Sequence, residues 1–498
     1  MMKFWRTFRL ALLLASIVAL ASCGSDSNNG TSFRMIQASP DLPLVYFLVD
    51  DVILPPARDY KGGPGFLTVT PQTYAFGFQA PVVGSDGVVT NVPITPTVQK
   101  SLDAGNEYTL VVIGKASADL ADTTHKLRPL IIENVTEDVP QGNARLQFVH
   151  AAPDVPPVVD IYLTAVPAPP ALLPDLSTQT PIAQVTYGEQ PAARQLVPPG
   201  TYVIRVTLAD SKDPVFDSGE LTLSNGTDFL LVAVDNTAAG ASPISLAVNS
   251  GFRAFYNPVG TFDILNKNSP SELRVVQVSP DAPALNVLGD PATAASLERT
   301  FATALTYLDY TGYVPTIPDS YTVRGVKTSA PDATPPLFAV AGNLVIGQRT
   351  TLFTTGLVAS ISPLVLPGDI RPVFAEGKLR IVDASPASAT VDVYILAPGK
   401  DFADPDVPPT LQNLVLRSAT TYLPFFPRNY TVTFTAAGSK ELVATAEVAA
   451  TACTVQTAVL VDEVRVDNTS TGKPAAVLLL DDRATEQIGR DACSGPGG

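Results

Sequence analysis

The chain has 498 residues, of which 46% are hydrophobic and only 16% charged, and it contains 46 prolines. This apolar content excludes a chain that is disordered throughout, and proline at this density stops long helices while suiting the edges and turns of β-structure. The 47 acidic residues outnumber the 32 basic ones, which argues against nucleic-acid binding because phosphates would be repelled.

Residues 1–22 have the pattern of a secretory signal, in which three basic residues precede the apolar run Leu10 to Leu20. The run is too short for a helix that spans a bilayer. It ends in Leu20-Ala21-Ser22-Cys23, which resembles the lipobox of bacterial lipoproteins. The resemblance implies cleavage before Cys23 and lipidation of its thiol. Gly24 is not the aspartate that retains such lipoproteins in the inner membrane, so we expect an anchor in the outer membrane. The alternative is an ordinary secretory signal with a chance cysteine.

The remaining cysteines are Cys453 and Cys493, and an exported chain lies in an oxidising compartment. We expect them to form a disulfide that ties the C-terminal tail, residues 486–498, to the last domain. Two free thiols are the alternative. Residues 23–31 are small and polar after the cysteine, which predicts a flexible tether whose lipid is the only membrane contact.

Beyond the tether, one motif recurs four times as a strand that runs into a proline turn. The prolines are Pro40, Pro153, Pro280 and Pro386. They lie 113, 127 and 106 residues apart, each the length of a small domain. Three residues before each proline stands a polar side chain, which we expect to form a hydrogen bond beside the turn. These side chains are Gln37, His150, Gln277 and Asp383.

An aspartate follows the proline in three copies, as Asp41, Asp154 and Asp281. We expect its carboxylate to cap the turn by accepting from a backbone N–H two residues further on. Calcium ligation is the alternative, since hard cations take carboxylate and carbonyl oxygens in loops.

A second motif follows each first one as a proline turn, a tyrosine and a strand. The tyrosines are Tyr74, Tyr202, Tyr321 and Tyr430. A residue type present in all four copies serves what the copies share, so we expect these rings in the cores. Fourteen or fifteen residues earlier stand Tyr60, Tyr187 and Tyr307, with Leu416 in the fourth copy.

About seven short strands per ~100 residues, with turn signals between them, predict immunoglobulin-like β-sandwiches. We expect four, at residues 32–139, 140–267, 268–375 and 376–485. The linkers are only a few residues long, which favours a semi-rigid rod over freely jointed domains.

The motifs together resemble DUF4397, a bacterial domain family of unknown function. The resemblance rests on the two recurring proline-turn motifs and on Val159 to Tyr162 and Val391 to Tyr394. It is clearest in residues 144–248. It implies exported, often tandem, sandwich-like modules. It implies no catalytic residues, since none is established for the family.

Sequence signatures of enzymes are missing: no Gly-x-Ser-x-Gly, His-Glu-x-x-His, Cys-x-x-Cys or phosphate-loop pattern occurs. We expect no enzymatic activity, cofactor or metal. Aromatic clusters are the candidates for binding a partner protein or a glycan, although most of their rings also suit a core. They are Tyr307, Tyr310 and Tyr313, and Phe425 with Phe426.

Three functions remain open. The first is a non-enzymatic, lipid-anchored envelope protein that acts as a binding or spacer module, facing the periplasm or the cell surface. The second is an array of carbohydrate- or peptidoglycan-binding modules, which a row of exposed rings on one sheet would favour. The third is a hydrolase, which a cleft with two close carboxylates would favour.

Overall fold

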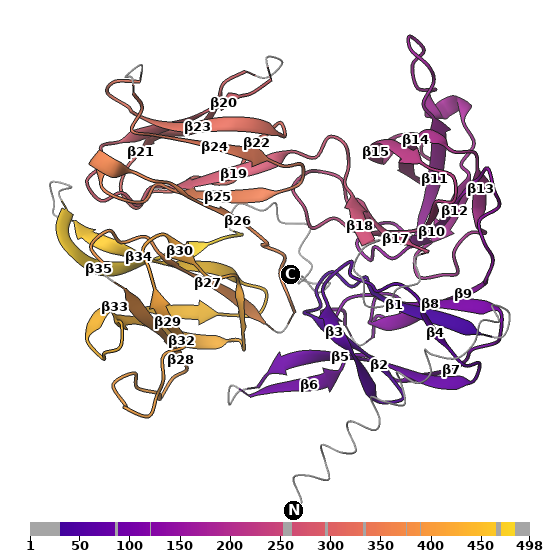
Figure 1. The fold of residues 1–498 in the computed structure, drawn as a ribbon, viewed down its shortest axis with the longest axis horizontal. Helices are drawn as coiled ribbons and strands as arrows, with labels where there is room; N and C mark the ends of the chain where they lie inside the picture. Colours follow the sequence, from indigo (N-terminus) through magenta and orange to yellow (C-terminus); the bar gives the residue numbers. More distant parts are fainter. Residues whose placement is uncertain are drawn as a thin grey trace, which may run out of the picture.

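The computed structural model describes residues 30–84, 88–119, 121–251, 261–293, 297–331, 335–374, 376–388, 390–464 and 470–483. The chain is all-β, as predicted. Its strands form eight sheets, arranged as four tandem two-sheet domains (Figure 1). Two short 3₁₀ turns, η1 (Leu176–Thr178) and η2 (Val358–Ser360), are the helical elements of these ranges. None of the described helices is long and apolar enough to cross a membrane.

Each domain has an inner sheet, defined as the sheet that carries the proline-turn motif, and an outer sheet. Domain 1 comprises β1 (Thr31–Gln37), β2 (Val45–Val49), β3 (Val52–Arg58), β4 (Leu67–Val69), β5 (Thr73–Val83), β6 (Val89–Pro93), β7 (Val98–Ser101), β8 (Asn106–Ile113) and β9 (Arg128–Val135). Its inner sheet has the order β4-β1-β8-β9. Its outer sheet has the order β3-β2-β5-β6, with β7 also pairing β5.

Domain 2 comprises β10 (Ala144–His150), β11 (Val158–Ala165), β12 (Ala183–Thr186), β13 (Gln195–Val197), β14 (Gly200–Leu208), β15 (Pro214–Leu223), β16 (Asp228–Asp235), β17 (Ile244–Ser250) and β18 (Thr261–Ile264). Its inner sheet has the order β13-β10-β16-β17-β18 and its outer sheet the order β12-β11-β14-β15.

Domain 3 comprises β19 (Ser271–Val276), β20 (Leu285–Pro291), β21 (Arg299–Leu305), β22 (Val314–Thr316), β23 (Asp319–Lys327), β24 (Phe338–Leu344), β25 (Arg349–Phe353) and β26 (Leu364–Pro367). Its inner sheet has the order β22-β19-β25-β26 and its outer sheet the order β21-β20-β23-β24.

Domain 4 comprises β27 (Gly377–Asp383), β28 (Val391–Leu396), β29 (Leu411–Leu414), β30 (Ser418–Ala419), β31 (Leu423–Phe425), β32 (Arg428–Ala436), β33 (Leu442–Ala450), β34 (Val455–Val464) and β35 (Ser470–Asp481). Its inner sheet has the order β30-β27-β34-β35, with β31 also pairing β27. Its outer sheet has the order β29-β28-β32-β33.

The recurring tyrosines close the domain cores. Tyr74, Tyr202, Tyr321 and Tyr430 are all buried, as predicted. In each copy the hydroxyl donates to the backbone carbonyl four residues earlier, at 2.8–3.0 Å. This hydrogen bond satisfies the polar end of a buried ring and fixes the turn that leads into the next strand, as a tyrosine corner does.

The domains pack in pairs through their inner sheets. Apolar side chains of β1, β8 and β9 meet those of β10, β16 and β17 in one buried cluster between domains 1 and 2. A second cluster joins β19, β25 and β26 to β27, β34 and β35 between domains 3 and 4. The central inner strands are therefore covered on both faces, and every residue of β1 and β10 is buried.

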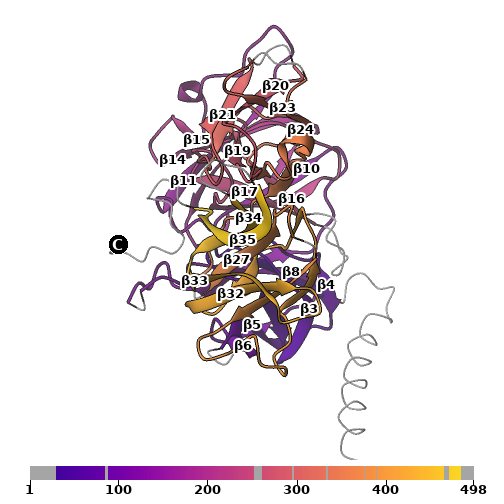
Figure 2. The ribbon, with the colours of Figure 1, turned by 90° about the vertical axis from the view of Figure 1, so that its left-hand side faces the viewer.

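The four domains close on themselves, so the expected rod is wrong (Figures 1 and 2). Arg349 of domain 3 donates to the Thr237 carbonyl of domain 2 at 3.1 Å. The linker between domains 3 and 4 lies on domain 1, where Arg371 donates to the carbonyls of Pro40 and Leu42 at 3.0 and 2.8 Å. Each inner sheet has a second apolar face, and this face is buried against the inner sheet of the paired domain. Short linkers therefore accompany a compact arrangement rather than a rod.

Candidate functional site

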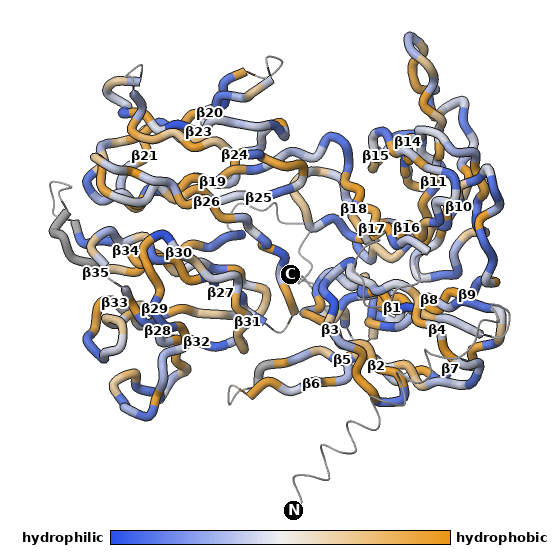
Figure 3. Tube along the Cα trace, viewed as in Figure 1, coloured by the Kyte–Doolittle hydropathy of each residue, from blue (hydrophilic) through white to orange (hydrophobic). Residues whose placement is uncertain are grey.

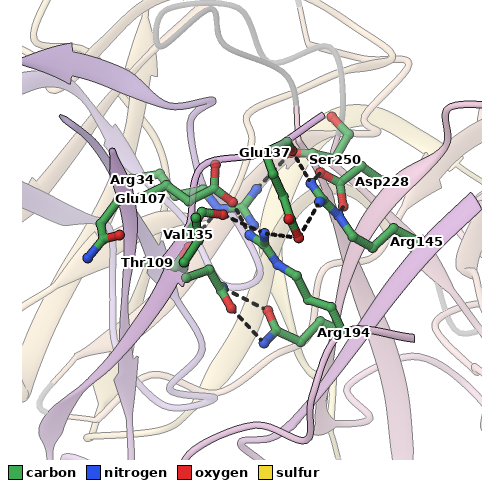
Figure 4. A network of polar contacts seen from close by, with 12 residues as sticks. Arg34, Glu107, Thr109, Val135, Glu137, Arg145, Arg194, Asp228 and Ser250 are labelled. Atoms are coloured by element: carbon green, nitrogen blue, oxygen red, sulfur yellow. Dashed lines mark hydrogen bonds and ion pairs between the residues drawn. The ribbon is translucent and has the colours of Figure 1, made fainter. Parts of the chain in front are cut away.

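The main polar cluster of domains 1 and 2 lies at the edge of their shared interface (Figure 4). It contains three arginines, Arg34 on β1, Arg145 on β10 and Arg194 just before β13. Three carboxylates face them. These are Glu107 on β8, Glu137 in the linker between the domains and Asp228 at the start of β16.

The hydrogen bonds of this cluster run within and between the domains. Arg145 holds Asp228 with two bonds, Nε to Oδ1 at 3.0 Å and Nη2 to Oδ2 at 2.7 Å. Arg194 of domain 2 donates to the Glu107 carboxylate of domain 1, and Arg34 of domain 1 donates to the Ser250 carbonyl of domain 2 at 2.7 Å. The cluster therefore fixes how the two inner sheets lie against each other.

The charges of this cluster balance one another. Burial lowers the pKa of Arg34 to about 10, so its guanidinium still carries its charge near neutral pH. Hydrogen bonding to Asp228 raises the pKa of Arg145. Three cations thus face three carboxylates, and a hollow of about 440 Å³ beside them is lined by the already paired Arg145 and Asp228.

Domains 3 and 4 carry a related cluster with fewer charges. Asp482 accepts from Arg274 Nη2 at 2.5 Å and from the Tyr422 hydroxyl at 2.6 Å, and its Oδ2 lies 4.0 Å from Arg380 Nη2. The two guanidinium groups stack on aromatic rings, Arg274 over Tyr313 and Arg380 over Tyr422. One buried carboxylate thus serves two buried arginines.

Tyr60 and Tyr307, which precede the core tyrosines of domains 1 and 3, each bond the neighbouring domain. The Tyr60 hydroxyl of domain 1 donates to the Asp235 carbonyl of domain 2 at 2.8 Å. The Tyr307 hydroxyl of domain 3 donates to the Asp462 carbonyl of domain 4 at 2.7 Å. We refer to these two equivalent contacts as the tyrosine clasps.

The predicted aromatic clusters do not form one site. Tyr307 and Tyr313 lie at the interface of domains 3 and 4, whereas the Tyr310 side chain is 45% exposed. Phe425 packs edge-on against Tyr430 with ring centroids 5.1 Å apart, and Phe426 lies under Arg428. Of the predicted binding rings, Tyr310 is the most available to solvent.

The polar residue of the proline-turn motif caps the turn in every copy, as predicted. Gln37, Gln277 and Asp383 each accept, through a side-chain oxygen, from the backbone N–H two residues on, at 2.6–3.0 Å. His150 does the same through Nδ1 at 3.3 Å. This shared bond explains why amide, imidazole and carboxylate all occur at one position.

The expected role of the aspartate after the proline is wrong, because the preceding polar residue already caps the turn. The Asp41 carboxylate accepts instead from the distant backbone N–H groups of Ala116 and Ser117, each at 2.8 Å. Asp281 accepts in the same way from Val358 at 2.7 Å. Asp154 of domain 2 forms an ion pair with Lys115 of domain 1 at 2.5 Å.

The alternative chemistries find little support in the described ranges. Within them, no group of three or more His, Cys, Asp or Glu side chains could hold a metal ion. Asp383 and Asp462 are close, since both accept from Ser385, but both are buried in the turn rather than placed in a cleft. Burial also lowers the pKa of His150, whose Nε2 lies 3.1 Å from the Pro156 carbonyl.

The predicted cysteine sites fall partly outside the described residues. Cys23 and Cys493 both lie outside them. Cys453 takes part in a disulfide, while its pairing with Cys493 stays a prediction.

The interface arginines are functional residues that the sequence motifs did not predict. Their signal was present, because Arg34, Arg274 and Arg380 each stand three residues before the capping residue of the turn. Each also bonds a threonine on the neighbouring parallel strand, 75 or 77 residues later.

Comparison with known proteins places these features in a family. No curated protein matches the chain. Among solved structures, a similar one is the Bacillus anthracis TIE protein, with 11% sequence identity over 91% of this chain and 79% of that one and a TM-score of 0.15. The family model of DUF4397, a domain of unknown function, matches residues 31–162, 271–394 and 377–490. It leaves out most of residues 144–248, where the sequence motifs resemble the family most clearly. These matches span most of the sequence, and the chain belongs to the DUF4397 family.

Proposed function

We propose that this chain is a non-enzymatic, lipid-anchored protein of the bacterial cell envelope whose four domains form one rigid platform for binding. The observation that carries the proposal is the double-sided burial of the inner sheets. Arginines and tyrosines that recur on the inner sheets bond one domain to the next, which leaves the outer sheets and loops for partners. A spacer would gain reach from an extended array, whereas these domains fold back on one another.

The glycan-binding alternative has weaker support. It needs a row of exposed rings on one sheet, but the exposed aromatic residues of the described chain are scattered. Tyr310 lies between β21 and β22, Phe262 on β18 and Phe374 in the linker before domain 4. The hydrolase alternative needs a cleft with two close carboxylates. The exposed carboxylates of Asp290 and Glu298 lie near each other, but both already pair with Arg324.

Rigidity is tested by small-angle scattering of the full chain and of Arg371→Ala. Arg371 is buried and donates to the Pro40 carbonyl of domain 1. Its loss should separate domain 1 from the linker between domains 3 and 4 and so increase the radius of gyration. Arg324→Ala is the matched control, because Arg324 pairs with Asp290 and Glu298 inside domain 3. An extended wild-type chain would contradict the platform.

The anchor is tested separately with Cys23→Ser. The Leu20-Ala21-Ser22-Cys23 sequence supports lipidation, so the variant should give an uncleaved or soluble product. A variant that still fractionates with the outer membrane would rule out the lipid anchor. Mass spectrometry of the non-reduced protein tests the Cys453–Cys493 pairing, which two alkylatable thiols would contradict.

A further inference from the structure

A hollow of about 750 Å³ lies where the linker between domains 2 and 3 meets domain 3. Lys267 to Pro270 form one wall, and the ends of the edge strands β21 and β22 form the other. Its size falls in the range of ligand pockets, which often lie at domain junctions. None of the interdomain locks described above uses it.

The lining of the hollow combines apolar side chains with one available cation. Leu297 is 91% exposed and Ile317 64% exposed, although both are aliphatic. Arg299 Nη2 donates to the Pro315 carbonyl at 2.7 Å. No carboxylate of the described residues pairs with Arg299, whereas Glu298 beside it already pairs with Arg324. An aliphatic segment that carries a carboxylate would complement this lining.

The chain itself presents such a segment. The loop of residues 166–175 in domain 2 projects beyond the sheets and carries hydrophobic residues at its tip (Figure 3). Leu172 in this loop is 88% exposed, and Asp175 is its single charged residue. We refer to residues 166–175 as the proline loop.

The base of the proline loop is held in place, which reduces the entropy lost on binding. Arg205 Nη2 donates to the Pro174 carbonyl at 3.1 Å. The Asp175 carboxylate accepts from the Ser177 N–H at 2.7 Å, and Leu176 is buried in the domain 2 core. A fixed base with an exposed apolar tip is suited to insertion into a preformed site.

We propose that the hollow binds the proline loop of a second copy of this chain, with Leu172 against Leu297 and Ile317 and Asp175 facing Arg299. Leu172 and Leu297 both remain exposed, so the loop and the hollow of one chain do not meet. Charge supports self-association at this point. Two copies with 47 acidic and 32 basic residues each repel one another generally. Here, however, a carboxylate meets the Arg299 guanidinium, which has no carboxylate partner among the described residues.

Sedimentation of the mature chain with Cys23→Ser, over a range of concentrations, tests the proposal without the lipid. We expect reversible self-association that Leu172→Asp and Ile317→Asp each weaken by about tenfold or more, as changes at an interface hot spot do. Leu442→Asp is the matched control, since Leu442 is 53% exposed on domain 4, away from both surfaces. Thermal unfolding should be unchanged in all three variants.

Mixing the two variants gives the sharper result. Leu172→Asp keeps an intact hollow and Ile317→Asp keeps an intact loop, so the mixture should form 1:1 complexes that neither variant forms alone. A wild-type chain that stays monomeric at every concentration overturns the proposal, whatever else the hollow binds. Association that survives both substitutions also overturns it. Either result leaves the lipid anchor and the rigid platform untouched.

Discussion

The interface of domains 1 and 2 and that of domains 3 and 4 share their apolar centre and differ in their charges. In both interfaces, two inner sheets bury the faces that point away from their own domain cores, and both interfaces carry a tyrosine clasp. Three arginines face three carboxylates in the first pair, whereas Arg274 and Arg380 share Asp482 in the second. The apolar centre therefore fixes the pairing, while the charges at its edge vary.

A second contrast shows that the repeating unit is a pair of domains. Domains 1 and 3 have Gly114 and Gly356 just after the inner strand, with φ of +96° and +95°, a conformation that favours glycine. Domains 2 and 4 have Asp235 and Asp462 at the matching places. The carboxylates of these aspartates accept from the proline-turn backbone, at Asp154 and Ala387. In domains 1 and 3 the turn supplies the carboxylate instead: Asp41 and Asp281 accept from backbone N–H groups that follow Gly114 and Gly356. Donor and acceptor are thus exchanged between the two types of domain.

The largest expected effect comes from removing the shared carboxylate. Asp482→Asn leaves two arginines, each 2% exposed, without a counter-charge, and should lower the free energy of unfolding of domains 3 and 4 by about 3–5 kcal/mol. Glu137→Gln is the matched change in the other pair. The Glu137 side chain is 60% exposed, so its loss should cost no more than about 1 kcal/mol.

Hydrogen exchange read by mass spectrometry distinguishes the pairs, because β25 and β34 report on one and β8 and β16 on the other. Equal losses from the two substitutions would mean that charge balance does not distinguish the interfaces.

Acid should change the stability contributions of the capping residues Asp383 and His150 in opposite directions. Burial raises the pKa of Asp383 from 3.8 to about 6, so the folded chain binds this proton more tightly than the unfolded chain. The contribution of Asp383 to stability therefore grows as pH falls from about 6 to 4, by about 3 kcal/mol in total. Burial lowers the pKa of His150 from 6.5, so its contribution is lost as pH falls through that value.

Urea unfolding of Asp383→Asn and His150→Gln between pH 7 and pH 4 checks these signs. Each variant keeps an acceptor for the turn. Burial also raises the pKa of Asp235, so the difference between variant and wild type is used to separate the effect of Asp383 or His150 from that of Asp235. Relative to wild type, the first variant should lose stability in acid and the second should gain it. Parallel pH curves for variants and wild type would refute the assignment.

The tyrosine clasps should be equal in strength. Tyr60→Phe and Tyr307→Phe each remove one hydrogen bond between domains and keep the ring, so each should cost about 1 kcal/mol. Hydrogen exchange of the corresponding pair measures the loss. A clasp that costs nothing in one pair alone would show that the two interfaces are not built on one plan.

The sequence predicted each sandwich well and their assembly poorly, for a physical reason. Proline turns and recurring tyrosines are local signals, so they predicted the strands, the burial of the tyrosines and the cap by Gln37. The interface had a local signal too, since Leu110 to Ile113 and Leu230 to Val234 are unbroken apolar runs, typical of strands covered on both faces. The arginines of its ion pairs recur in the sequence, but their partners could not be predicted, because Arg274 and Asp482 are 208 residues apart.

The smallest expected effect separates the exposed ring of Tyr310 from the half-buried rings of Tyr307 and Tyr313. Tyr310→Ser removes a side chain that is 45% exposed, so it should change the free energy of unfolding by less than about 0.5 kcal/mol. Tyr313→Ser, three residues on, removes the ring beneath buried Arg274 and should destabilise domains 3 and 4 by about 3 kcal/mol, as a large-to-small change at a packed site does. Hydrogen exchange of β25 and β34 compares the two variants directly. A Tyr310 variant as unstable as the Tyr313 variant would make all three tyrosines of this segment part of the lock. A stable Tyr310 variant leaves this ring available for a partner of the proposed platform, on the same domain that carries the hollow.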